Sequence, residues 1–279
     1  MDVADPPAAT GSPAQDESAS SIVKAVDVLA LFGAATPALR VEDITARLGY
    51  TRSTAYRYVR ELCAAGLLAP RPEGRYSLGP RIVELERLLR VTDPLYRAGC
   101  AVLPPLRADD CAYLLQELSG DDRVLCIYKE GPDELRHGRQ VCVLNRERGL
   151  PFPLFRGAGS LALLANLSAD RIRRTYLASA AQIADAGLGN SWDEFRGAMA
   201  AIRKRGYSLV RRADAPYLIG IAVPVLLGAD KRVIGSLDYV ITRDSIDEAQ
   251  GRALAHKLDG VAAAIADEYE RISRSNPLP

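Results

Sequence analysis

Apolar side chains first recur at helical spacing near residue 20. Ser20 is a hydroxyl residue suited to capping a helix N-terminus, and the apolar residues after it fall three or four positions apart. These apolar positions are Ile22, Val26, Leu29 and Phe32. A first helix is therefore expected after Ser20, ending at Gly33 and Pro37.

Two further helices are expected directly afterwards, separated by a short turn. The segment VEDITARL (41–48) has apolar residues suited to a second helix, and Gly49 closes it. Thr51 is placed to cap a third helix. Such a tight glycine-containing turn between two helices is typical of a helix-turn-helix. The expected apolar contacts of the second helix are Val41, Ile44, Ala46 and Leu48.

The third helix has an unusual outward face. Its stretch TRSTAYRYVREL (51–62) places Ala55, Val59 and Leu62 on one inward face. Its single acid is Glu61. The side chains expected to point outward are Arg52, Ser53, Tyr56, Arg57 and Arg60. Packing alone does not explain a helix with this face.

A two-stranded hairpin is expected after the third helix. Leu67 and Leu68 begin one strand, and the alternating residues 75–78 form the returning strand. The turn between them contains Pro70, Pro72 and Gly74. A hairpin after a helix-turn-helix is a wing, and this one carries Arg71 and Arg75 near its tip.

Positive charge is concentrated on this helix and hairpin. The whole chain has a net charge of only +1, whereas residues 52–75 hold five arginines and two acids, a local net charge of +3. This geometry suits a helix in the DNA major groove and a wing along the phosphate backbone. Ser53 and Thr54 would donate to phosphate. Arg52 or Arg57 would fork onto guanine, and Tyr56 would contact a thymine methyl or a phosphate. A merely solvated basic helix is the alternative.

The first quarter of the chain resembles the N-terminal domain of IclR-type transcriptional regulators. The resemblance is carried by SSIVKAVDVLALF, VEDITARLGYTRSTAYRYVRELCAAGLL and GRYSLGPRIVEL. Those proteins have a winged helix-turn-helix whose recognition helix contains the core S-T-x-x-R, which is met here by Ser53, Thr54 and Arg57. The wing ending of the family is met by Gly74, Tyr76, Leu78 and Gly79.

A connector with a one-sided apolar stripe is expected over residues 81–100. Pro94 would bend or end this helix. The stripe consists of Ile82, Leu85, Leu88 and Leu89. Such a stripe must be buried against the second domain or against a partner chain. The resemblance implies a linker helix near which the DNA-binding halves dimerise, and hence a homodimer or homotetramer.

The second half, residues 101–279, alternates strand-like and helical stretches. Two strands joined across a turn are expected at 111–118 and 123–130, and another at 141–145. Helices are expected at 160–167 and 168–180. Further strands are expected at 207–212, 219–227 and 233–241, with helices at 191–206 and from 245 to about 272. This order predicts an α+β sheet domain.

This half is similar to the effector domain of the IclR family, which has a GAF-like fold. The segment PLFRGAGSLALLA (153–165) and the blocks RGYSLV and IAVPV carry the resemblance. The expected fold is therefore an N-terminal all-α winged helix-turn-helix at 20–80, a linker helix at 81–100 and a GAF-like α+β domain at 101–279. The resemblance also implies a small organic acid as effector.

An effector site is expected at the start of a helix, at Gly157, Ala158, Gly159 and Ser160. Free amides and the dipole of a helix N-terminus attract carboxylates, and small residues let a ligand approach the backbone. A close helix–sheet crossing is the alternative. A dinucleotide fingerprint formed by Gly157, Gly159 and Ala162 is disfavoured, because no βαβ unit surrounds it.

The resemblance adds pocket positions at Gly220, Asp238 and Val240, with Asp214 in a preceding loop. Asp238 and Val240 replace the small or hydroxyl residues common in the family, and Tyr217 replaces a glycine. An ionised Asp238 would repel a second carboxylate and accept hydrogen bonds from a hydroxyl or amine. We therefore expect an aromatic or hydroxylated acid as ligand. Arg211 and Arg212 are candidate anion contacts, only one of which would face inward. Tyr113, Tyr128, Tyr217 and Tyr239 are candidate aromatic walls or ordinary sheet residues.

Composition fits a folded protein, with 48% hydrophobic and 25% charged residues. Residues 1–19 are small, acidic and proline-rich, which predicts a disordered tail rather than a signal peptide. The apolar run 221–227 is too short to span a bilayer, so a cytoplasmic protein without a membrane partner is expected. Five cysteines and two histidines show no zinc spacing, and buried reduced thiols are favoured over a redox sensor.

No catalytic motif is found in the sequence. It contains no GxSxG, GxxxxGK or HExxH pattern, so no enzyme, cofactor or metal site is expected. The residues together predict a regulator that binds double-stranded operator DNA and responds to a small organic acid. A sensor that acts through a protein partner rather than DNA is the alternative.

Overall fold

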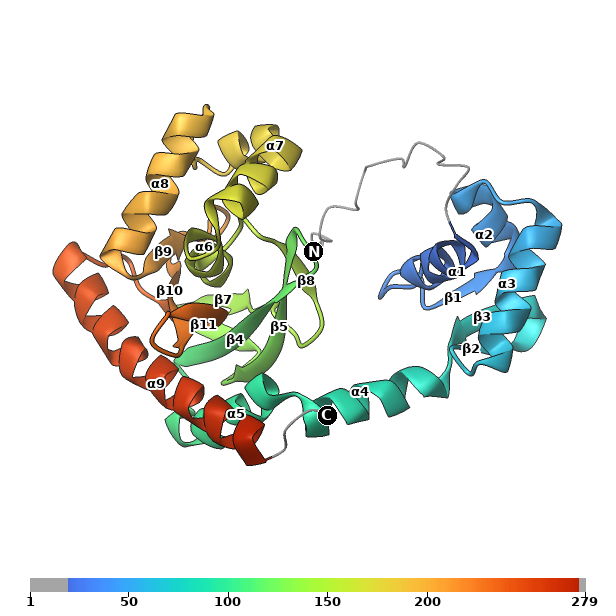
Figure 1. Cartoon of the computed structure of the whole chain (residues 1–279), viewed down its shortest axis with the longest axis horizontal. Coiled ribbons are helices and arrows are strands. Elements are labelled where there is room, and N and C mark those ends of the chain that lie inside the picture. The colour runs from blue at the N-terminus through green and yellow to red at the C-terminus, as the bar shows by residue number, and fades with distance from the viewer. Residues whose placement is uncertain (1–19, 276–279) are drawn as a thin grey trace. The chain divides into compact units, whose positions relative to one another are not determined.

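The protein consists of two compact units, Met1–Leu89 and Arg90–Pro279. The computed structural model describes residues 20–275, and the tail expected at residues 1–19 lies outside that range. The boundary between the units falls inside the expected connector. Figure 1 shows the elements of both units.

The described part of the first unit contains α1, α2, α3, most of α4 and a small antiparallel sheet (Figure 1). The strand order in this sheet is β1-β3-β2, and a short turn of 3₁₀ helix joins β2 to β3. The elements are α1 (Ser21–Ala30), β1 (Ala38–Arg40), α2 (Val41–Leu48), α3 (Arg52–Ala64), β2 (Leu68–Arg71), the 3₁₀ turn (Pro72–Gly74) and β3 (Arg75–Leu78). The sequence did not predict β1, which is only three residues long.

The helix caps predicted from the sequence are confirmed. Ser20 caps α1 by accepting a hydrogen bond from the Val23 amide at 3.4 Å. Gly49 ends α2 in the left-handed conformation with a φ of 67°, which glycine adopts without steric cost. Thr51 caps α3 by accepting from the Thr54 amide at 3.3 Å. These contacts fix the short turn between α2 and α3.

The core of the first unit differs partly from the expected helix faces. The inward residues expected for α3 are buried, and so is Tyr58, which is 2% exposed. In α1 the buried residue is Val28, whereas Ile22 and Val26 are 76% and 55% exposed. The apolar stripe expected for α1 was therefore wrong at these positions, because apolar residues also lie on the helix side that faces away from the core. Ala46 of α2 is likewise exposed.

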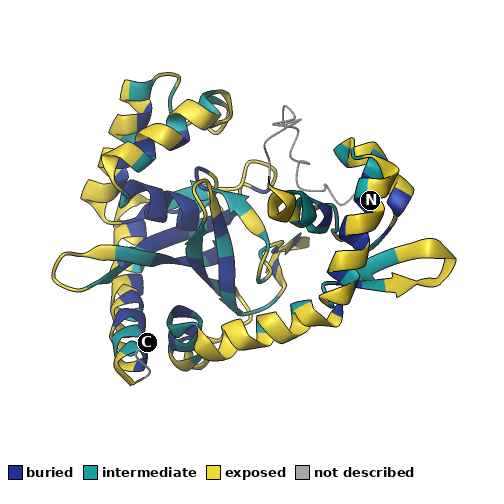
Figure 2. Ribbon diagram, turned by 45° about the vertical axis from the view of Figure 1, so that its right-hand side comes forward, coloured by how far each residue is buried: buried dark blue, intermediate teal, exposed yellow. Residues whose placement is uncertain are grey.

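The connector helix ends beside Pro94, as predicted, and a second helix follows it. Helix α4 (Pro80–Thr92) ends before Asp93, and α5 (Pro94–Val102) begins immediately afterwards. Asp93 accepts hydrogen bonds from the Leu95 and Tyr96 amides at 2.8 and 3.1 Å, so it caps α5. Figure 2 shows that α4 is exposed along most of its length. Its exposed residues include Leu85 and Leu89.

A six-stranded antiparallel sheet forms the centre of the second unit. Its strand order is β8-β5-β4-β11-β10-β9, and a separate two-stranded hairpin is formed by β6 and β7. The strands are β4 (Cys111–Ser119), β5 (Arg123–Glu130), β6 (Glu134–His137), β7 (Gln140–Val143), β8 (Pro151–Pro153), β9 (Ser208–Arg211), β10 (Leu218–Leu227) and β11 (Arg232–Thr242). The short strands β6 and β8 were not predicted from the sequence.

Helices cover both faces of this sheet (Figure 1). On one face lie α6 (Ala158–Ala165), α7 (Ala169–Asp185) and α8 (Trp192–Arg205); on the other lie α5 and α9 (Glu248–Ser275). Alternate residues of the strands therefore enter two separate cores. One core is packed against α5 and α9 and includes Ile221 and Leu237, and the other includes Leu164 and Phe195.

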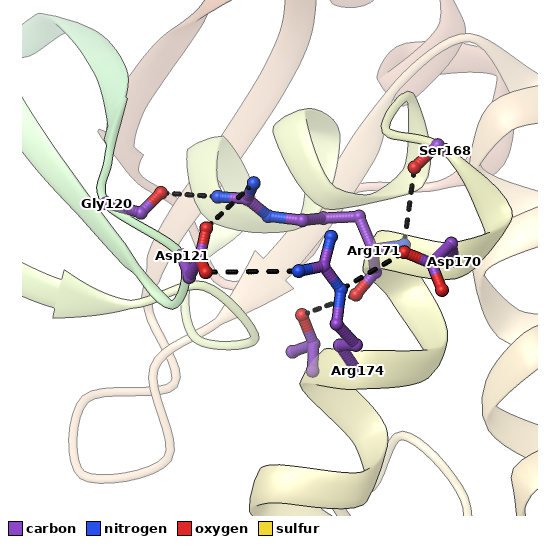
Figure 3. Close-up of polar contacts among 7 residues, drawn as sticks. Gly120, Asp121, Ser168, Asp170, Arg171 and Arg174 are labelled. Carbon is purple, nitrogen blue, oxygen red and sulfur yellow. Dashed lines mark hydrogen bonds and ion pairs between the residues drawn. The ribbon is translucent and has the colours of Figure 1, made fainter.

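Two arginines of α7 hold the turn between β4 and β5 (Figure 3). Arg171 forms an ion pair with Asp121 at 2.9 Å and donates to the Gly120 carbonyl oxygen. Arg174 lies between Asp121 and Asp170, and its Nε is 3.1 Å from the Asp170 carboxylate. These contacts position α7, and thereby the loop behind α6, relative to the sheet.

Candidate functional site

The outward face of α3 is exposed as expected. Arg52, Ser53, Tyr56, Arg57 and Arg60 are all exposed, and Thr54 is half-buried. The face is held in place because Ala55, Val59 and Leu62 are buried on the opposite side. A single helix thus joins a fixed core to a polar surface.

Arg57 of this surface is supported by a buried tyrosine. Its Nη2 donates to the Tyr58 hydroxyl at 3.1 Å, and its guanidinium carbon lies 4.9 Å from the Tyr58 ring centroid. Because the Tyr58 ring is buried, it gives the exposed arginine a rigid support. Such support lowers the entropy cost of a later contact.

Most of the basic surface is free of intramolecular carboxylates. Within residues 20–275, Arg57, Arg60 and Arg71 form no ion pair with an acid. Arg52 pairs with Glu42 at 3.2 Å, but both side chains remain exposed. An exposed pair of this kind is worth at most about 1 kcal/mol, so it would exchange readily for a phosphate.

The wing carries one acid between two arginines. Glu73 lies 3.9 Å from Arg75 and 3.4 Å from Arg40, and all three are exposed. Arg71 instead donates to the Ser77 hydroxyl at 2.8 Å. Arg40, in β1, was missed from the sequence because β1 was not predicted. Its position places a further cation beside the wing.

Hydroxyl groups gather at the N-terminus of α3. The Thr51 hydroxyl donates to the Thr54 hydroxyl at 2.8 Å and lies 3.1 Å from the Ser53 hydroxyl. The helix N-terminus adds its positive dipole end and free amides. Together these groups form a surface suited to a phosphate.

A second polar site lies where the first turn of α6 crosses the sheet. Gly157 precedes α6 with a φ of 87°, which favours glycine. Every residue of α6 is buried. The Ser208 hydroxyl donates to the Ala158 carbonyl oxygen at 2.5 Å, which ties the helix to β9. The predicted segment 157–160 therefore lies inside the second unit.

Buried polar side chains of β4 and β11 face this turn. Asp238 is 5% exposed and Gln116 is 2% exposed. Asp238 accepts a hydrogen bond from the side-chain amide of Gln116 at 3.4 Å. A Cβ atom at Gly159 would lie 2.5 Å from the Gln116 side chain. Because Gly159 has no side chain, the Gln116 side chain can pack against the first turn of α6.

Arg146 supplies a cation that the sequence did not reveal. Its side chain follows β7 in an irregular segment, and its guanidinium carbon lies 3.4 Å from the Phe152 ring centroid. A Cβ atom at Gly157 would lie 2.8 Å from Arg146 Nη2. The side chain as a whole is half-buried, but its Nη1 atom has no contact with solvent. Nothing in the local sequence distinguishes this arginine from its neighbours.

Several buried polar atoms here have no hydrogen-bond partner. Among the described residues six such atoms occur, and five belong to this side of the sheet. They are Gln116 Oε1, Arg146 Nη1, Ser160 Oγ, Ser236 Oγ and Asp238 Oδ1. Because buried polar groups are normally paired, this cluster marks a place suited to a polar ligand.

Burial controls the charge of the acid in this cluster. It raises the pKa of Asp238 to about 6, although Arg146, the Gly159 amide and Gln116 act in the opposite direction. Burial also lowers the pKa of Arg146 and raises the pKa of the Cys126 thiol to about 12. The site therefore contains a carboxyl group that changes charge near neutral pH and a thiol that stays protonated.

The raised pKa of Asp238 predicts a pH-dependent effect of Asp238→Asn on stability. The pKa of this group is higher in the folded protein than in the unfolded chain, so the folded protein binds more protons between the two pKa values. The contribution of protonated Asp238 to the free energy of unfolding is therefore lost as pH rises through about 6. The asparagine variant has no such loss. Its free energy of unfolding relative to wild type is expected to rise by about 2–3 kcal/mol between about pH 4 and pH 8. Chemical denaturation at both pH values measures this, and an equal difference at both would contradict it.

Three other predicted site residues lie near this polar cluster. Gly220 lies beside Asp238, and Val240 is buried on the same sheet face. Tyr217 packs against the apolar cluster that contains Val240, and its ring stacks on His137 with a centroid distance of 5.1 Å. These residues surround the end of the site that is formed by the β6–β7 hairpin.

Arg211 does not fit the expected role of anion contact. It pairs with Ile219 across β9 and β10, on the face opposite to α6, and donates to the Asp244 carbonyl oxygen at 3.2 Å. Arg212 lies on the side of Arg146, but its Nε is 2.7 Å from the Asp214 carboxylate. The alternation of the strand explains why only Arg212 faces this side.

The proposed aromatic walls are mostly sheet residues of the other face. Tyr113, Tyr128 and Tyr239 pack against the core under α5 and α9. Tyr113 and Tyr239 contact each other with ring centroids 5.0 Å apart. Of the four tyrosines considered, Tyr217 alone borders the polar cluster of the α6 face.

A partly open cleft of about 290 Å³ lies elsewhere in the second unit. Glu117 and Tyr269 line it, together with Asp93 at the start of α5. Burial, followed by the nearby charge of Asp93, raises the pKa of Glu117 to about 7. The cleft is on the opposite side of β4 from Gln116, because Glu117 is the next residue of the strand.

Residues 20–275 contain neither a metal-binding cluster nor a helix that could span a membrane. No group of three or more histidine, cysteine, aspartate or glutamate residues in this range is arranged to hold a metal ion. No helix in the described part is long and apolar enough to cross a membrane.

These features define a winged helix-turn-helix protein with a separate α+β unit, and the family comparison agrees. Residues 21–72 match the model of the IclR helix-turn-helix domain. No curated protein matched the chain.

Solved structures share the fold of both units. An IclR transcriptional regulator from Alicyclobacillus acidocaldarius is 24% identical, with 89% of this chain and 98% of that one covered and a TM-score of 0.67. One from Silicibacter sp. TM1040 is 22% identical, with 91% and 96% covered and a TM-score of 0.70. An IclR homologue from Microbacterium hydrocarbonoxydans, complexed with 4-hydroxybenzoate, is 24% identical, with 90% and 100% covered and a TM-score of 0.64.

The domain match shows that residues 21–72 are similar to the IclR helix-turn-helix domain, and the solved structures show the fold of both units. The α+β unit agrees with the GAF-like fold expected from the sequence.

Proposed function

We propose that the protein regulates transcription by binding an operator through α3 and the wing. The observation that carries this proposal is the exposed basic face: Arg57 and Arg60 lie on one side of a helix whose other side is buried, and neither is neutralised by an acid. A protruding helix of this kind fits the major groove, where arginine reads guanine. Arg52, with its labile exposed partner, would join this contact.

The remaining residues of the surface are proposed to hold the DNA backbone. Ser53 and Thr54 lie at the positive end of the α3 dipole, and Tyr56 is exposed one turn further along. Arg71 and Arg75 extend the cationic surface along the wing. Contacts of this type fix the register of a protein on DNA without reading its sequence.

A small organic acid is the proposed effector of the second unit. The unpartnered polar atoms around Ser160 and Asp238 support a polar ligand at the start of α6. The homologue bound to 4-hydroxybenzoate supports an aromatic or hydroxylated acid. Binding would shift operator affinity by the difference in ligand affinity between the DNA-bound and DNA-free arrangements.

We further propose a homodimer or homotetramer that acts in the cytoplasm. Exposed apolar side chains along α4, such as Leu85 and Leu89, support burial against another copy. A dimer would bind a pseudo-palindromic operator with half-sites about one helical turn, or a multiple of it, apart.

The alternative function is a small-molecule sensor that acts through a protein partner. Such a sensor needs no affinity for duplex DNA, whereas the proposed regulator does. A gel shift with the promoter of an adjacent gene separates the two.

Arg75→Ala is expected to weaken binding to all duplex sequences alike. Because Arg75 is proposed to contact phosphate, its loss should flatten the dependence of log affinity on log salt by about one unit. Fluorescence anisotropy between about 50 and 200 mM salt measures this slope.

Arg173→Ala is the matched control for this experiment. Arg173 is an exposed arginine of α7 in the second unit, so the variant removes the same charge from a residue that is not part of the wing surface. An equal change of slope in both variants would contradict a specific role of Arg75. A wild-type protein without any salt-dependent DNA affinity would contradict the proposed function itself.

A further inference from the structure

Three arginines form one row across the small sheet of the first unit. Arg40 of β1 lies directly opposite Arg75 of β3, and Arg75 lies directly opposite Arg71 of β2. Residues that are directly opposite in an antiparallel pair share one face of the sheet. Because neighbouring strands are about 4.8 Å apart, the Cα atoms of this row extend over about 10 Å. These three residues are called the arginine row below.

The arginine row lies on the face of the sheet that points away from the core. Leu39 and Tyr76, which are opposite each other at the next position of the register, lie on the other face. Leu39 is 2% exposed in the core of the first unit, and Tyr76 packs against that core. The alternation of side chains along a strand therefore directs the three arginines to solvent, and all three are exposed.

One acid, Glu73, is placed among these arginines at the tip of the wing. Its carboxylate lies 3.4 Å from Arg40 and 3.9 Å from Arg75. Two positive charges thus share one negative charge. Arg71 forms no ion pair within the described residues, and its Nε donates to the Ser77 hydroxyl at 2.8 Å. The three arginines and the single acid leave this face with a net positive charge.

The backbone of Glu73 shows that the geometry of the turn does not account for this residue. Glu73 has a φ of 61° and a ψ of 27°, a left-handed conformation that glycine adopts at lower cost. Among the described residues other than glycine, only Glu73 and Lys231 have a positive φ. Strain of this kind is often kept where a side chain has a role. The Glu73 side chain has its two ion pairs with the arginine row.

We propose that Arg40, Arg71 and Arg75 bind the phosphate backbone of DNA as one row, and that Glu73 is a built-in counter-ion which a phosphate must displace. The proposal rests on the proposed function, because it adds Arg40 to the wing surface and assigns a group that limits its affinity. Phosphates follow one another about every 3.4 Å of axis along a DNA strand, so the row is long enough to contact more than one. Exposed ion pairs are weak, and a phosphate can therefore replace the carboxylate.

A purely structural role of Glu73 makes the opposite prediction. Like charges directly opposite each other across a sheet are destabilising, so an acid between Arg40 and Arg75 would hold β1 against β3. In that case removal of the acid would destabilise the first unit and would not strengthen DNA binding. A counter-ion, in contrast, competes with phosphate, and its removal strengthens DNA binding.

Fluorescence anisotropy of the full-length protein with duplex DNA of unrelated sequence tests the proposal. Glu73→Gln is expected to bind this DNA about 3- to 10-fold more tightly than wild type, because a negative charge beside the phosphate is removed. Glu61→Gln is the matched control, since Glu61 is an exposed acid of α3 outside the arginine row. It removes the same charge from the same unit and should have a clearly smaller effect.

Arg40 has a different expected signature. Arg40→Ala should bind the same DNA about 3- to 10-fold more weakly and should flatten the slope of log affinity against log salt by about one unit. Arg40→Lys should restore most of both, because a phosphate contact needs the charge more than the planar fork. Glu73→Gln should raise the affinity less in the Arg40→Ala background than in wild type. Chemical denaturation shows whether the first unit of each variant is folded.

The outcomes separate this proposal from the proposed function. If Glu73→Gln binds DNA no more tightly than wild type, or no more tightly than Glu61→Gln, the counter-ion role is overturned. If Arg40→Ala keeps the affinity and the salt slope of wild type, Arg40 does not belong to the phosphate-binding row. In both cases DNA binding by wild type still supports the proposed regulator. If wild type has no salt-dependent affinity for duplex DNA, the proposal and the proposed function fail together.

Discussion

Tyr58→Ala is expected to destabilise the first unit by about 3–5 kcal/mol, the range for truncating a large buried aromatic residue. Tyr58 is 2% exposed and packs in the same core as Val28 and Ile44. Its ring also contacts Tyr50 with centroids 5.9 Å apart. A unit of this size has only several kcal/mol of stability. The variant should therefore lose the fold of α3 and, with it, all DNA affinity.

Hydrogen exchange of peptides from α3 measures this loss within the full-length protein. Tyr58→Phe is the control, since it keeps the buried ring and removes only the hydroxyl that accepts from Arg57. It should unfold close to the wild-type transition and bind DNA with a modest loss of affinity. Slow exchange of α3 in Tyr58→Ala would show that the ring does not hold this helix.

Arg57→Ala is expected to weaken operator binding by about 1–3 kcal/mol, or roughly 5- to 150-fold, if Arg57 reads a base. The side chain is exposed, so its removal should leave the stability of the unit nearly unchanged. The loss should be much smaller on unrelated duplex DNA, because base contacts carry the sequence preference.

Arg57→Lys refines this test, because lysine keeps the charge and loses the two-pronged geometry that matches guanine. A base-reading role predicts that lysine restores affinity for unrelated DNA but little of the operator preference. Full recovery of operator affinity by lysine would assign Arg57 to a phosphate instead. Competition assays with operator and unrelated DNA distinguish the two results.

The DNA-binding unit could be predicted from the sequence because its signals are local. Ser20, Gly49 and Thr51 cap helix ends within a few residues of their partners. The burial of Ala55, Val59 and Leu62 followed from helical spacing alone. In α1 the same reasoning failed at Ile22 and Val26, because apolar residues lie on more than one side of the helix and spacing does not choose between them.

The polar cluster beside α6 was only partly predictable because its parts are distant in the sequence. Gln116 and Asp238 are separated by 122 positions, and only the register of β4 against β11 brings them together. Gln116 was detectable in principle, as a polar residue within the apolar run of a strand. Arg146 gave no such signal, since an arginine in an irregular polar segment is usually a surface residue.

Selection of duplexes from a random DNA pool tests the central claim most directly. That claim is that the exposed arginines of α3 read DNA sequence. Wild type and Arg173→Ala are expected to enrich the same pseudo-palindromic motif, and Arg57→Ala is expected to lose the preference at one position in each half-site. Enrichment of an identical motif by Arg57→Ala, Arg52→Ala and Arg60→Ala, or of no motif by wild type, would contradict the claim.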